Sequence, residues 1–172
     1  MFFLIRHGYP DYSQQNTKIY QGYGMNLSPL SQKGIEEIKE TAKDIRLKNA
    51  DIIISSPYTR ALQTAAIISK AVGVDIAVET DLHEWIANRD YVYEDDKTAI
   101  EAYCQYTYNN GECPEGVNVK WETASDIKCR VIPILEKYKH LHKVVVACHG
   151  TLIQALTGGN IPKHGEIVEF VL

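Results

Sequence analysis

Two histidines follow apolar runs that lie near opposite ends of the chain. The run Phe-Phe-Leu-Ile near the start is followed at once by Arg6 and His7, and the run Val-Val-Val-Ala-Cys is followed by His149 and Gly150. Short apolar runs that end in turn residues are typical of buried strands in a parallel sheet. Ligands of open α/β sheets bind just beyond the carboxyl ends of the strands. We therefore expect His7 and His149 to share one site.

A third strand end supplies another cation. The apolar run Asp51–Ser55 precedes Pro57, and the residues after it recur at helical spacing up to Gly73. Pro57 suits the first turn of a helix, so Arg60 is expected near the helix N-terminus. The partial positive charge of that terminus favours an anion at the same place. The alternative is that Arg60 faces solvent, as many helical arginines do.

Two arginines and two histidines at strand ends are too cationic for a metal site, and no HExxH or Cys/His spacing occurs in the chain. A serine hydrolase is poorly supported because GxSxG is absent. Guanidinium groups pair bidentately with phosphoryl oxygens. A neutral imidazole can attack phosphorus, and the arginines would stabilise the charge that develops on the oxygens. The predicted chemistry is therefore phosphoryl transfer without a metal.

Such a reaction also needs an acid for the departing alkoxide. Glu84 is the nearest candidate in the irregular stretch 81–90, and it lies beside Trp85. An apolar neighbour favours the protonated form of a carboxyl group. The alternative is that Glu84 is an ordinary surface residue.

The elements that must position these residues alternate between strand and helix. Residues 9–30 hold glycines, prolines and tyrosines with little periodicity, and we expect a long loop that is functional rather than a mere surface excursion. Ser31 is expected to cap the helix that follows. The expected helices are 31–49, 57–72, 94–108, 120–139 and 151–156, and the expected strands are 2–5, 51–55, 74–78, 144–148 and 166–171.

The length of the chain indicates the number of domains, and its net charge indicates which kinds of partner to expect. The chain has 172 residues, a net charge of −4 and a pI near 5.9. We expect one domain over residues 1–172, and no nucleic-acid or membrane partner. The four cysteines are widely spaced, which predicts free thiols and a cytoplasmic location. An extracellular protein with a disulfide is the alternative. The oligomeric state is left open.

The chain as a whole resembles the histidine phosphatase superfamily, also called the phosphoglycerate-mutase-like family. The resemblance extends from residue 1 to about residue 153. The matching residues are Arg6-His7-Gly8, Gln21-Gly22, Pro29-Leu30-Ser31 with Gly34, Ser55-Ser56-Pro57 with Arg60-Ala61 and Gln63-Thr64-Ala65, Leu82 with Glu84, and His149-Gly150.

The resemblance implies a three-layer α/β/α fold with a mainly parallel sheet and a small helical or loop lid, placed at about 86–120. It implies a phosphomonoesterase that forms a phosphohistidine at His7, with Glu84 as the proton donor and later the base for water. No metal or cofactor is implied. The substrate is a small phosphorylated metabolite or a phosphoprotein, and the implied phosphate-binding residues are Arg6, Ser13, Gln21, Gly22, Arg60, His149 and Gly150.

Departures from the family pattern leave alternatives open. Tyr9 and Pro10 follow Arg6-His7-Gly8, whereas the family usually has a threonine two residues after this glycine. Ser13 stands where an asparagine is common. A mutase and a non-catalytic phosphate-binding module of the same fold are the alternatives to a phosphatase. The retained Glu84 favours an enzyme, because binding alone needs no acid.

Overall fold

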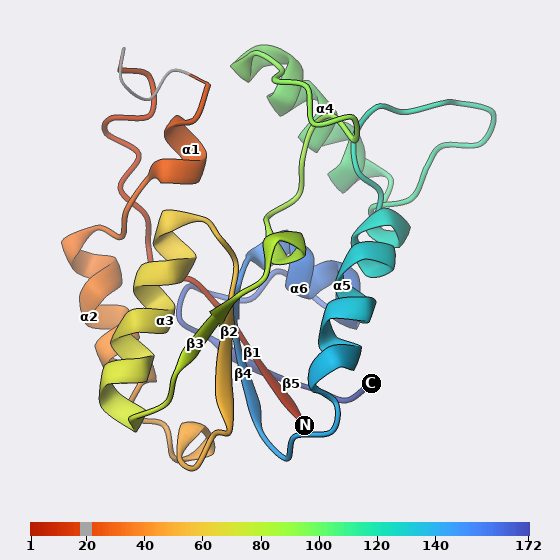
Figure 1. The fold of residues 1–172 in the computed structure, drawn as a ribbon. Coiled ribbons are helices and arrows are strands. Elements are labelled where there is room, and N and C mark those ends of the chain that lie inside the picture. The colour runs from red at the N-terminus through yellow and green to blue at the C-terminus, as the bar shows by residue number, and fades with distance from the viewer. Residues whose placement is uncertain (18–21) are drawn as a thin grey trace.

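The computed structural model describes residues 1–17 and 22–172. Its centre is a five-stranded sheet in the order β3-β2-β4-β1-β5 (Figure 1). The first four of these strands are mutually parallel, and β5 runs antiparallel to β1 at one edge. The strands are β1 (Phe2–Arg6), β2 (Ile52–Ser55), β3 (Ile76–Val78), β4 (Val144–Cys148) and β5 (Ile167–Phe170).

Helices cover both faces of this sheet. The α-helices are α1 (Gly24–Leu27), α2 (Gln32–Thr41), α3 (Thr59–Val72), α4 (Asp96–Tyr108), α5 (Ala124–Tyr138) and α6 (Gly150–Thr157), and two short 3₁₀ helices are η1 (Ile45–Leu47) and η2 (Thr80–Leu82). Helices α2 and α3 lie on one face, and α5 and α6 lie on the other (Figure 1). Helices α1 and α4 lie beyond the carboxyl ends of the parallel strands.

The alternation of side chains along β1 explains why both faces are covered. Phe2 and Leu4 belong to the core under α5 and α6, whereas Phe3 and Ile5 belong to the core under α2 and α3. Successive residues of a strand point to opposite faces, so a strand that is apolar throughout needs a layer on each side. The predicted three-layer α/β fold with a mainly parallel sheet is confirmed.

Two predicted helix signals are confirmed in α2 and α3. The Ser31 hydroxyl accepts a hydrogen bond from the Gly34 amide at 3.1 Å, so Ser31 caps α2 as expected. Gly73 ends α3 in the left-handed region, with φ at 74°. Pro57 precedes α3 by two residues instead of lying in its first turn, because Tyr58 occupies the N-cap position.

The boundaries of two expected helices were wrong, and one expected loop contains a helical turn. The helix from residue 31 ends at Thr41 and not at residue 49, because the Asp44 carboxylate caps the separate turn η1 by accepting from the Arg46 amide. Helix α5 begins at Ala124, where the Thr123 side chain and Asp126 form a capping box. The loop of residues 9–30 contains one turn of helix, α1.

The segment before α5 forms a small aromatic cluster instead of the expected first helical turn. Trp121 is buried against Tyr106 of α4, with ring centroids 5.8 Å apart, and Trp85 contacts Tyr103 at 5.3 Å. These contacts form a small core of their own between Trp85 and Trp121, separate from the two main cores beside the sheet. That residues 86–120 act as a lid stays a prediction.

The structure bears on two further expectations. All four cysteines are free thiols, and Cys148 is the buried one. Within residues 1–17 and 22–172, no helix has the length and hydropathy needed to cross a membrane.

Candidate active site

His7 follows β1 and is the centre of the site. Its side chain is buried, with 3% exposed. Nδ1 lies 2.8 Å from the Gly8 carbonyl, which can only accept, so Nδ1 carries the proton. Nε2 lies 3.1 Å from Nε of Arg60, which can only donate, so Nε2 presents its lone pair. Burial, followed by the charge of Arg60, lowers the pKa of His7 to about 3. The imidazole is therefore neutral over the whole physiological range.

Arg60 lies in the first turn of α3 and is buried, so the structure excludes the alternative of a solvent-facing arginine. Besides its hydrogen bond to His7, its Nη1 donates to the carbonyl of Met25 in α1. The guanidinium carbon also lies 5.0 Å from the centre of the Tyr58 ring. The Arg60 side chain therefore joins the nucleophile candidate His7 to helix α1.

His149 follows β4, and its ring centroid lies 5.2 Å from that of His7. The two histidines predicted to meet do meet, because β1 and β4 are adjacent and parallel. Nε2 of His149 lies 2.7 Å from the Ser56 hydroxyl, and Nδ1 is buried with no partner in the described part of the chain. Complete burial, with Arg60 next in importance, lowers the pKa of His149 well below its usual value. A neutral ring with a free nitrogen can contact an oxygen of a bound anion.

Arg6 ends β1, and its guanidinium also has unused hydrogen-bonding capacity. Nη1 donates to the Pro162 carbonyl at 2.8 Å, whereas the buried Nε has no partner among the described residues. Gly150 lies against this side chain, because a Cβ there would come within 3.0 Å of the Arg6 Nε and 2.8 Å of Ile161. A side chain at position 150 would crowd both Ile161 and the Arg6 guanidinium.

Glu84 follows η2 and reaches the first turn of α6. One carboxylate oxygen accepts from the Trp85 amide at 2.9 Å, and the other lies 3.4 Å from the Thr151 amide. Thr151 is two residues from His149, so Glu84 is brought to the same end of the sheet as the histidines. The structure therefore does not support the alternative that Glu84 is an ordinary surface residue.

A buried ion pair holds the segment that carries Glu84. Arg130 of α5 contacts Glu122 through Nε and Nη2, the latter at 3.0 Å, and its Nη1 donates to the Asp81 carbonyl. The Trp85 indole donates to the Glu122 carbonyl at 2.7 Å. These contacts fix the backbone on both sides of the carboxylate.

The structure does not bring Ser13 and Gly22, which were also predicted to bind phosphate, into the group formed by the two histidines and two arginines. Ser13 is exposed, and its amide donates to Asp11. It lines a cavity of about 210 Å³ together with Asp11, Gln14, Gly24, Leu27, Ser28 and Pro29. None of Arg6, His7, Arg60 and His149 lines that cavity. Gly22 is exposed, with φ at 81°, and a Cβ there would lie 3.9 Å from Tyr93, a residue of the predicted lid. Gln21 lies outside the described residues.

Sequence reasoning missed three side chains that contact the site. Ser56 and Tyr58 both touch His149, the latter with ring centroids 5.2 Å apart. Ser56 and Tyr58 closely follow the end of β2, so the same strand-end pattern that indicates His7 and His149 also indicates these two residues. His164 comes from the loop before β5, and its ring centroid lies 5.6 Å from that of His7. No apolar strand precedes His164, so the strand-end pattern could not find it.

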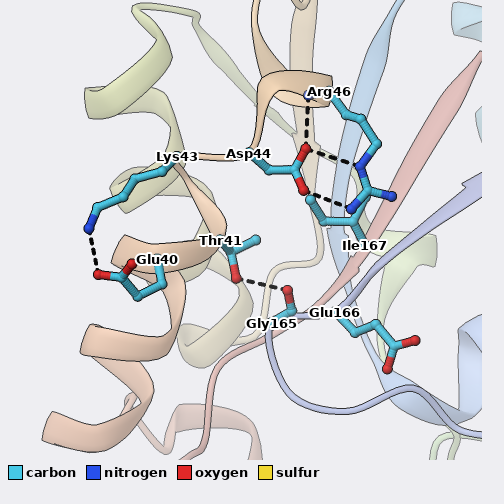
Figure 2. Close-up of a pocket in the computed structure, with 8 residues that line it drawn as sticks. All are labelled: Glu40, Thr41, Lys43, Asp44, Arg46, Gly165, Glu166 and Ile167. Atoms are coloured by element: carbon cyan, nitrogen blue, oxygen red, sulfur yellow. Dashed lines mark hydrogen bonds and ion pairs between the residues drawn. The ribbon is translucent and has the colours of Figure 1, made fainter.

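Another cavity, of about 630 Å³, lies between the end of α2 and the start of β5 (Figure 2). Its charged side chains pair with each other, as Lys43 does with Glu40 and Arg46 with Asp44. None of the predicted catalytic residues lines it.

Within residues 1–17 and 22–172, no group of three or more His, Cys, Asp and Glu side chains is arranged to hold a metal ion. That the reaction needs no metal or cofactor stays a prediction, which an assay in the presence of a chelator can test.

Proteins of known structure share this arrangement of sheet and helices. The mycobacterial glucosyl-3-phosphoglycerate phosphatase superposes with a TM-score of 0.67 at 21% identity, covering 91% of this chain and 77% of that one. At this level of identity the similarity establishes the fold alone.

Sequence comparison gives the family. The chain is 28% identical over 156 residues to "uncharacterized phosphatase PhoE" of Bacillus subtilis, which covers 89% of this chain and 73% of that protein. It is 26% identical over 172 residues to a "probable phosphoglycerate mutase GpmB" of Photorhabdus laumondii, which covers 95% and 77%. The family model of the histidine phosphatase superfamily (branch 1) matches residues 2–163. With nearly the whole sequence matched, the chain belongs to the histidine phosphatase superfamily.

Proposed function

We propose that this protein hydrolyses phosphomonoesters through a phosphohistidine at His7, without a metal ion. The observation that carries the proposal is the tautomer of His7. Its Nδ1 proton is held by the Gly8 carbonyl, and its Nε2 lone pair faces a buried arginine. An imidazole that is neutral, fixed in orientation and next to a cation is suited to attack an anionic phosphoryl group.

In the first step, the Arg60 Nε–H turns from Nε2 of His7 to a phosphoryl oxygen, which frees the Nε2 lone pair. Nε2 then forms a bond to phosphorus while the bond from phosphorus to the ester oxygen breaks. The departing oxygen takes a proton from the carboxyl group of Glu84 and leaves as an alcohol. The unpartnered Nε of Arg6 and Nδ1 of His149 support this step, since both are buried nitrogens without a partner in the described chain. Nδ1 of His149 is a donor in the tautomer in which Nε2 accepts from the Ser56 hydroxyl. Phosphoryl oxygens would supply the acceptors, and Arg60 would stabilise their growing charge.

In the second step, a water molecule attacks phosphorus and the bond to Nε2 breaks. The Glu84 carboxylate takes the proton of the water, which restores the acid, and inorganic phosphate leaves. The same carboxyl group thus serves as acid and then as base. Its two backbone hydrogen bonds, from Trp85 and Thr151, support this role because they fix both oxygens near the histidines.

A steady-state assay with p-nitrophenyl phosphate in the presence of EDTA tests the proposal. We expect steady turnover by the unmodified chain and none above background in His7→Ala. The matched control is His142→Ala, because His142 is exposed at the opposite end of the sheet, next to Met1. Phosphate binding without turnover would instead identify a non-catalytic module, and transfer to an added alcohol or phosphate ester in preference to water would identify a mutase.

A further inference from the structure

His164 is a third imidazole at the candidate site, and no step proposed above uses it. Its ring centroid lies 5.6 Å from that of His7, with the ring planes at 47°. On its other side it packs edge-on against Tyr9, with centroids 5.2 Å apart. The side chain is partly exposed, so it lies between the buried nucleophile and the solvent.

The backbone on both sides of His164 is fixed by Arg6. The Arg6 Nη1 donates to the Pro162 carbonyl at 2.8 Å, and the Gly165 amide donates to the Arg6 carbonyl at 2.9 Å. The Thr41 hydroxyl adds a third contact, donating to the Gly165 carbonyl at 2.8 Å (Figure 2). The loop that carries His164 is therefore held to the same arginine that is predicted to bind the phosphate.

Burial, supported by nearby positive charge, favours the neutral form of the His164 ring. Burial lowers the pKa of His164 to about 4, and the nearby charge of Arg6 acts in the same direction. Lys33 of α2 also lowers it, while Glu37 of the same helix opposes the effect. A neutral imidazole has one N–H donor, and no hydrogen bond from the described residues acts on the His164 ring. The donor is free for a ligand.

We propose that His164 is a phosphate-binding residue whose ring N–H donates to a phosphoryl oxygen of the substrate held at His7. This inference rests on the proposed function. A phosphorus atom placed for attack lies about 3–3.5 Å from the attacking atom, so its oxygens reach into the space beside the His7 ring. His149 and His164 both border that ring, with centroids 5.2 Å and 5.6 Å from that of His7, so both imidazoles are close enough to contact those oxygens.

The test compares His164→Phe with His164→Gln. Phenylalanine keeps a ring to pack against Tyr9 but has no donor, whereas glutamine restores an N–H. The probe is inorganic phosphate, measured both as a competitive inhibitor and by calorimetric titration. A hydrogen bond to a charged group corresponds to roughly tenfold or more in affinity, so His164→Phe should weaken phosphate binding by about that factor. His164→Gln should regain most of the loss, and the surface variant His142→Ala should bind as the unmodified chain does.

Two results would overturn the proposal. In one, His164→Phe binds phosphate as tightly as the unmodified chain. In the other, His164→Gln is as weak as His164→Phe while both melt normally, which would assign His164 a packing role. Failure of the proposed function is recognised separately, because the unmodified chain would then bind phosphate without turnover. The titrations of the His164 variants would remain readable in that case.

Discussion

Arg60→Lys is the substitution that separates the charge of this residue from its geometry. Arg60 is 3% exposed, and its guanidinium donates from Nε to His7 and from Nη1 to the Met25 carbonyl. A lysine keeps the positive charge but has a single terminal nitrogen, so it cannot occupy both positions. We therefore expect the variant to fold with α1 less firmly held and with the phosphoryl group poorly aligned.

The size of the effect follows from the role proposed for the guanidinium. A preorganised donor aimed at developing transition-state charge contributes about 2.7–4 kcal/mol, which corresponds to a loss of about 10²- to 10³-fold in kcat. The measurement is kcat and KM for p-nitrophenyl phosphate, with thermal unfolding recorded in parallel. We expect most of the loss in kcat, because the donor acts on charge that is largest in the transition state.

Arg46→Lys is the matched control. Arg46 lies at the surface, paired with Asp44 and Glu169, and its replacement should leave kcat unchanged. A loss below tenfold in kcat for Arg60→Lys, with the fold intact, would refute the assignment of Arg60 to the transition state.

Three further predictions concern the proton donor Glu84, the packing around Gly8 and the pH dependence of the free energy of unfolding. Glu84→Gln should slow turnover of alkyl phosphates far more than that of p-nitrophenyl phosphate, because a good leaving group needs little protonation; parallel kcat measurements check this. Gly8→Ala should lower the melting temperature, because a Cβ at position 8 would lie 2.5 Å from the Gly34 carbonyl oxygen, and overpacking costs about 1–3 kcal/mol. The free energy of unfolding should fall as the pH drops from about 6.5 towards 3. In the unfolded chain His7 takes up a proton at its usual pKa of 6.5, whereas in the folded chain its pKa is about 3, so protons favour the unfolded state between these values. Denaturant titrations at several pH values should show a shallower dependence for His7→Gln.

A specific result would contradict each of these three predictions. Equal losses on both substrates would mean that a group other than Glu84 supplies the proton. Gly159→Ala is the control for Gly8, since its Cβ would meet only an ordinary contact at 3.5 Å, and equal melting of the two variants would contradict the packing argument. An unchanged pH dependence in His7→Gln would show that His7 is not held neutral by the fold.

The sequence predicted the meeting of His7, Arg60 and His149 because each follows or opens an element next to a strand end. The topology of a parallel sheet brings strand ends together, so the distance along the chain did not matter. Glu84 was harder to place, since nothing local fixes an irregular stretch. Its position depends on the buried Glu122–Arg130 pair and on Trp85, which are contacts between distant segments.

The incorrect predictions also have physical causes, some local and some due to contacts between distant segments. The apolar spacing of residues 35–45 continued past Thr41, but the chain turns there because Asp44 forms a separate cap. Trp121 lies within the expected helix 120–139, yet it packs into the aromatic cluster with Trp85, Tyr103 and Tyr106, and its indole donates to Gln105. His164 carried no local signal because it reaches the site only through the contacts of its loop with Arg6.

The most direct test is to trap the covalent intermediate. Rapid mixing with substrate, quenching in base and mass analysis of the peptides should find one acid-labile phosphoryl group on His7. Phosphorus NMR should place it on Nε2, because Nδ1 holds its proton against Gly8. A phosphoryl group on another residue, on Nδ1, or at undiminished level in His7→Ala would contradict the proposed mechanism.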